Sequence, residues 1–223
     1  MTSIWPICPA CTSSPPIWWC FACWLPAAAG MPAPPRAEAA ARLFFLSCSA
    51  TLESAPRGGG SSMKDYIIAD LQQDLANIQE YFERSTRSLT EEDSGFAPAE
   101  GTFTAAQQVA HVAQTVEWFF NGAFNPDGFP MDWEAMDREV RAVTSLAEAR
   151  RWLQRAFAAG QAAIAAHEPS EWEALLPPGP IMGGAPRFAI LGAIRDHTAH
   201  HRGALTVYTR LLGKVPPMPY MEA

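Results

Sequence analysis

The chain has 223 residues, of which 48% are hydrophobic and 17% are charged, and its formal net charge is −7. This length is sufficient for a domain with a buried core. The acidic balance argues against nucleic-acid binding, because phosphates require basic partners. No apolar run reaches the roughly 18 residues that a membrane-spanning helix needs, so we expect no membrane span.

Residues 1–62 differ in composition from the rest of the chain. They contain all five cysteines and four of the eight tryptophans, few charges, and a final Gly/Ser-rich run. We therefore predict an unstructured extension over 1–62 and a helical domain over 63–223. Two alternatives remain for the extension. In the first, translation begins at Met63, so that the extension is not part of the native protein. In the second, two CxxC pairs bind zinc through Cys8, Cys11, Cys20 and Cys23.

From Met63 onward, apolar residues recur with the 3.6-residue period of a helix, and no segment shows sustained strand alternation. The pattern favours an all-α four-helix bundle. The segment between the second and third predicted helices is long for a hairpin, which predicts a short helix around 133–140 or a crossover connection. The four long helices are predicted over about 63–86, about 104–121, from Ser145 to about 164, and from the end of the Pro/Gly-rich stretch 177–186 to Leu212.

Two histidines lie on the apolar face of the last predicted helix. His197 and His201 are four residues apart and are therefore neighbours on that face, whereas His200 lies nearer the polar side. The pair is explained equally well by two ordinary core histidines, each with its own partner, or by one shared metal ion such as zinc, nickel, copper or iron. The candidate for a third ligand is His111 on the second helix, with a surface histidine as the alternative. His167, near the end of the third helix, is interpreted as a surface residue.

Two segments carry a family resemblance. One is DHTAHHRG at 196–203, followed by a Leu-Leu-Gly and proline tail, and the other is AAQQVAH at 105–111. Together they resemble the DinB family of bacterial four-helix metal-binding proteins. The resemblance implies a DinB-type bundle and a divalent metal ion, zinc or nickel, held by His111, His197 and His201.

The resemblance covers about residues 63–220 and implies a metal-dependent enzyme that acts on a small molecule. Transfer of a low-molecular-weight thiol is ranked slightly ahead of hydrolysis, and three protein ligands would leave positions open for water or substrate. No general base is identified, because Glu117 lies away from His111 on its helix and Tyr208 is expected in the core. Family members commonly have glutamine after the HRG segment, where this chain has Ala204.

A second hypothesis is a stress-related metal-binding or interaction protein without turnover, and a third is a role that depends mainly on homodimer formation. The helical part contains no cysteine, and the default location is the reducing cytoplasm. We expect neither nucleic acid nor a membrane as a partner.

Overall fold

Helices dominate the computed structural model, which describes residues 63–221. The expected all-α bundle is confirmed for these residues, and one isolated β-bridge, between Leu175 and Pro186, joins two loop segments. The predictions made for 1–62, including the zinc site and the start at Met63, lie outside the described residues, and the boundary at 62/63 stays a prediction. The long helices are α1 (Met63–Thr86), α2 (Ala105–Phe124), α4 (Leu146–Ala166) and α6 (Ile190–Leu211).

Side-chain caps explain where the central helices begin. The Thr104 hydroxyl accepts a hydrogen bond from the backbone N–H of Gln107, three residues into α2, and the Ser145 hydroxyl does the same for Glu148 in α4. Gly213 follows the end of α6 with a φ of 74°, a conformation that glycine adopts readily. The predicted helix boundaries are thus confirmed to within about three residues.

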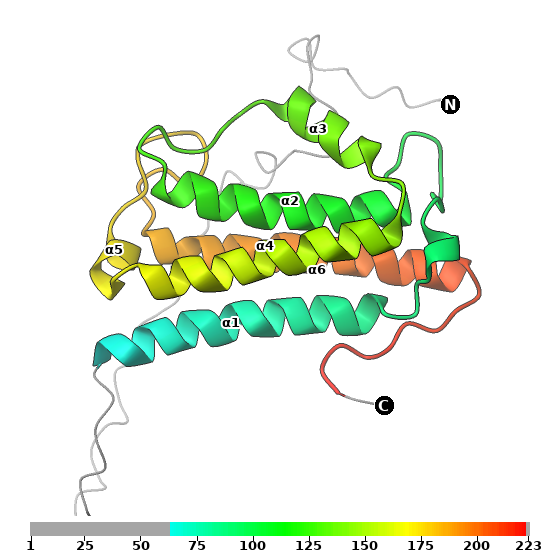
Figure 1. Cartoon of the computed structure of the whole chain (residues 1–223), viewed down its shortest axis with the longest axis horizontal. Coiled ribbons are helices and arrows are strands. Elements are labelled where there is room, and N and C mark those ends of the chain that lie inside the picture. The colour runs from blue at the N-terminus through cyan, green and yellow to red at the C-terminus, as the bar shows by residue number, and fades with distance from the viewer. Residues whose placement is uncertain (1–62, 222–223) are drawn as a thin grey trace, which may run out of the picture. The chain divides into compact units, whose positions relative to one another are not determined.

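Each long helix has two long neighbours. α2 packs against α4 and α6, and α1 packs against the same two helices, so α1 and α2 lie across a diagonal of the bundle. Figure 1 shows α1 and α6 running in one direction, with α2 and α4 running in the other. Parallel α2 and α4 require the connection between them to return along the whole bundle. That connection contains α3 (Trp133–Ala142), so the short helix and the crossover are both present.

The core lies between the four long helices and contains large side chains such as Phe82 and Phe157, which are fully buried. Gly160 on α4 permits an unusually close approach of its neighbours. A Cβ atom at this position would lie 2.6 Å from the Phe120 ring and 2.9 Å from the Leu75 side chain. This glycine is therefore required by packing between helices rather than by its backbone conformation.

The end of the bundle where α1 finishes is held together by side chains from several elements. The Arg150 guanidinium donates to the backbone carbonyl of Thr86, at the last residue of α1. The Ser94 hydroxyl, just after the 3-10 helix η3 (Glu91–Asp93), accepts from the backbone N–H of Leu146. At the opposite end, the chain passes through α5 (Pro169–Glu173) and the 3-10 helix η4 (Arg187–Ala189) before α6 begins. Among the described helices, none has the length and apolar character that a membrane crossing requires.

Candidate metal centre

The first histidine of the predicted site comes from α2, which is covered on nearly all sides. His111 is 3% exposed, although it lies off the main apolar stripe of its helix. The outer side of α2 is covered by α3 and the loop before it: Gln114 donates to Glu139 on α3, and the Trp118 indole N–H donates to the Pro130 carbonyl. The alternative of a surface histidine is therefore wrong, because the crossover connection covers this face.

The other two histidines come from one face of α6. His197 and His201 are 8% and 5% exposed, and they are flanked along the helix by the buried residues Ile194 and Leu205. Their spacing of four residues places the second ring one turn beyond the first. His200 is exposed, as its position on the polar side predicted.

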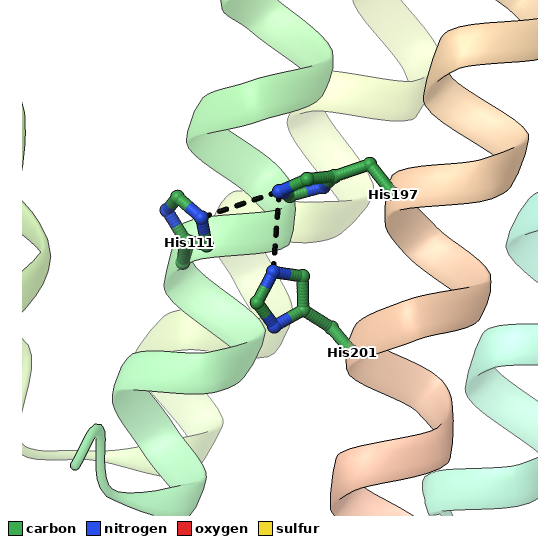
Figure 2. A group of neighbouring side chains, drawn as sticks. All are labelled: His111, His197 and His201. Atoms are coloured by element: carbon green, nitrogen blue, oxygen red, sulfur yellow. Dashed lines mark hydrogen bonds between the residues drawn. The ribbon is translucent and has the colours of Figure 1, made fainter. Parts of the chain in front are cut away.

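The three imidazole rings meet at their Nε2 atoms, as Figure 2 shows. The Nε2 atom of His197 lies 3.2 Å from that of His111 and 3.1 Å from that of His201. The three candidate ligand atoms all lie within 4.8 Å of one another. The structure thus brings together, from two separate helices, the residues that the sequence singled out.

A chain of hydrogen bonds fixes the protonation of one ring. The Tyr208 hydroxyl donates to the Phe103 carbonyl and accepts from the Gln108 amide nitrogen, at 3.0 Å and 3.3 Å. The amide oxygen of Gln108 therefore faces Nδ1 of His201, and because a carbonyl oxygen only accepts, this Nδ1 carries the proton. A neutral His201 then presents the lone pair of Nε2 to the other two rings.

Neutral rings cannot satisfy both contacts between the histidines. If Nε2 of His201 accepts, Nε2 of His197 must donate its single proton in that contact. The same atom then has neither a second proton nor a lone pair for the contact with His111. A cation that accepts one lone pair from each ring would remove this conflict, which is one reason that the residues fit a metal ion.

Burial keeps the three rings in the form that binds metals. Desolvation lowers the pKa of His111 to about 4. It also lowers the pKa of His197 and His201 well below the usual value, and the neighbouring histidines add to the effect. All three side chains are therefore neutral at pH 7, with lone pairs available to a cation.

The two separations from the Nε2 atom of His197 also suit a coordination sphere. Zinc–imidazole bonds are about 2.0–2.1 Å long, so two ligand nitrogens lie about 3.4 Å apart at a tetrahedral angle and about 2.9 Å apart at a right angle. The observed 3.1 Å and 3.2 Å fall between these values. Three neutral nitrogen donors suit borderline ions such as zinc or nickel better than magnesium or calcium, which prefer oxygen.

The remaining predicted residues lie outside this cluster or support it. Glu117 accepts from the Trp152 indole N–H at 3.0 Å and does not bond to the histidines. Tyr208 is buried in the core as expected. His167 is partly exposed at the end of α4, where its ring stacks on Phe124 with centroids 3.8 Å apart. Ala204, which stands where relatives commonly have glutamine, is half-buried on α6.

Gln108 is a site residue that the sequence analysis missed. It is 1% exposed and bonds directly to His201. Its position three residues before His111 places both side chains on the same side of α2, which is the signal that could have revealed it.

Comparison with known proteins identifies the family of the chain. The family model of the DinB family matches residues 69–223, which is more than half of the chain. No curated protein matches the sequence. The helical bundle and the matched region together show that the chain belongs to the DinB family.

Proposed function

We propose that this protein binds a divalent metal ion, zinc or nickel, through His111, His197 and His201, and uses it to act on a small molecule. The convergence of three buried Nε2 atoms carries the proposal. Three histidine ligands with an open coordination position are typical of catalytic rather than structural zinc. A bound ion of this kind activates a water molecule or stabilises a substrate thiolate.

The substrate class is proposed to be a low-molecular-weight thiol that is transferred to an electrophile, with hydrolysis as the second reaction. The protein would contribute by holding the three histidine rings in position for the metal ion rather than by transferring protons. Gln108 fixes the orientation of His201, and the lowered pKa values keep the three rings unprotonated. Burial around the rings excludes competing water, which strengthens electrostatic interactions.

A metal-binding protein without turnover is the alternative, and one observation favours it. The three rings are at most 8% exposed. Two surface hollows of the described residues, one between α2 and α4 and one beside α6, are lined by other side chains. In this conformation a substrate therefore has little access to the histidines.

Elemental analysis tests metal binding. We expect about one zinc or nickel ion per chain in the purified full-length protein and a loss of nearly all of it in His201→Ala. His200→Ala is the matched control, because the exposed neighbouring histidine should leave the metal content unchanged. Equal metal content in His201→Ala and wild type would refute the proposed ligand set.

Turnover separates the enzyme from the alternative. The metal-loaded protein is mixed with a bacillithiol- or mycothiol-type thiol and an aryl halide electrophile, and loss of the free thiol is followed before and after chelation. Enzymatic transfer predicts a rate that disappears with the metal and is absent in His201→Ala. A metal-loaded protein that shows no metal-dependent turnover with either thiols or ester substrates would favour the alternative.

A further inference from the structure

A second feature lies on the other side of α6 from the histidines. A hollow of about 350 Å³ is bounded on one side by α6 and the last turn of α1, and on the other by the chain that follows α6. Arg202, Thr206 and Arg210 recur at intervals of four residues and form one ridge of α6 along this hollow. Figure 1 shows the C-terminal segment turning back from the end of α6.

The two arginines of the ridge lack carboxylate partners among the described residues. The Arg202 guanidinium lies 5.7 Å from the ring of Tyr220 and donates to its hydroxyl at 3.3 Å. Arg210 donates to the Thr206 carbonyl at 3.0 Å. By contrast, Arg195 on the same helix forms an ion pair with Asp74. The positive charges at the hollow are therefore not neutralised by a carboxylate within residues 63–221.

The opposite wall is held in place and offers few donors. Prolines at 216, 217 and 219 have no backbone N–H, so most of the hydrogen-bond donors that line the hollow lie on the arginine side. The wall is fastened by Arg84, which donates to the Pro219 carbonyl at 2.7 Å, and by the ion pair between Lys214 and Asp93. The hollow therefore combines a cationic ridge with a fixed apolar wall.

We propose that this hollow binds the phosphate group of a small molecule. Guanidinium groups match phosphate oxygens in geometry as well as charge, and two of them line this one hollow without a carboxylate partner among residues 63–221. The proline wall would contact the organic part of a phosphate ester. Because His197 and His201 face the bundle interior, this site does not depend on the proposed metal function.

Calorimetric titration of the full-length protein in phosphate-free buffer tests the site. The probes are inorganic phosphate and phenyl phosphate. We expect saturable binding at one site, with a dissociation constant about tenfold or more higher in Arg210→Gln and an intermediate value in Arg210→Lys, which keeps the charge but loses the planar fork. Arg138→Gln is the matched control, because it removes the same charge from an exposed position on α3.

The two probes separate the two sources of phosphate. Tighter binding of phenyl phosphate would assign the site to an organic ester, and equal binding would assign it to phosphate itself. The proposal is overturned if neither probe saturates, if Arg210→Gln binds as wild type does, or if Arg138→Gln weakens binding equally. Binding should persist in His201→Ala, which makes this test independent of the metal.

Discussion

Replacing Gln108 with methionine should weaken metal binding without removing any ligand. The Gln108 side chain is fully enclosed, and its amide oxygen accepts from Nδ1 of His201. Methionine has a similar length and no branch, so it should fill the space while offering no comparable acceptor. His201 would then lose both its preferred tautomer and its fixed ring orientation.

The expected size follows from the bonds that are removed. Loss of a partner behind a metal-bound histidine typically lowers metal affinity by about 10- to 100-fold, or about 1.4–2.7 kcal/mol. The metal-free protein should also lose about 1–3 kcal/mol of stability, because a buried Nδ1–H is left without its acceptor. Tyr208→Phe should have a smaller effect on affinity, since the bond between Gln108 and His201 stays in place.

Competition with a coloured zinc chelator measures the affinity, and urea unfolding measures the stability. The matched control is Gln114→Met, a buried glutamine on the same helix whose amide nitrogen bonds to the Met136 carbonyl and to Glu139 instead. This control should lose stability but keep the wild-type affinity for zinc. A folded Gln108→Met protein with unchanged affinity would refute the role assigned to Gln108, as would an equal loss in Gln114→Met.

Three further predictions concern stability. The pKa of His111 is about 4 in the folded chain and about 6.5 when unfolded, so the unfolded state binds more protons below pH 6.5. Between pH 7.5 and pH 5 the metal-free protein should therefore lose at least about 2 kcal/mol of stability in urea unfolding, since the lowered pKa values of His197 and His201 act in the same direction, and a flat profile would contradict this. Gly160→Ala should destabilise the folded protein by about 1–3 kcal/mol, because the added Cβ would collide with its neighbours. Gly192→Ala places its Cβ near no other atom and should stabilise the protein by about 0.5–1 kcal/mol. Thermal melts that rank the two variants in reverse would refute the packing argument. Arg150→Met should lower the free energy of unfolding by about 1–3 kcal/mol, because it removes a hydrogen-bond donor to the end of α1. Arg155 is exposed, so Arg155→Met should change the free energy of unfolding by less than about 0.5 kcal/mol, and urea unfolding measures both.

The sequence was sufficient to predict the positions of the helices and the burial of the histidine pair on α6. Helix periodicity and the capping residues are local signals, so the starts at Thr104 and Ser145 could be predicted from a few neighbouring residues. His197 and His201 could be assigned to the interior because α6 has one buried face, and a single apolar stripe marks it.

His111 and Gln108 were harder to place for a physical reason. α2 is buried on almost all sides, so its apolar stripe does not separate inside from outside. The cover on its outer side comes from α3 and the loop before it, whose position depends on the crossover rather than on local pattern. The hydrogen bond from His201 to Gln108 joins residues 93 positions apart, and such long-range pairs cannot be derived from the spacing within one helix.

The long stretch of chain between α2 and α6 also determines when the three imidazoles can act together. His111 and His197 are separated by 86 residues. Closing a loop of that length in an unfolded chain costs about 4–5 kcal/mol of chain entropy. An unfolded polypeptide would therefore offer a cation only the adjacent pair from the last helix, while the assembled bundle offers all three rings. An ion bound at this position would cross-link the second and last helices. Because it would bind the folded chain more tightly than the unfolded chain, its dissociation would be thermodynamically linked to unfolding.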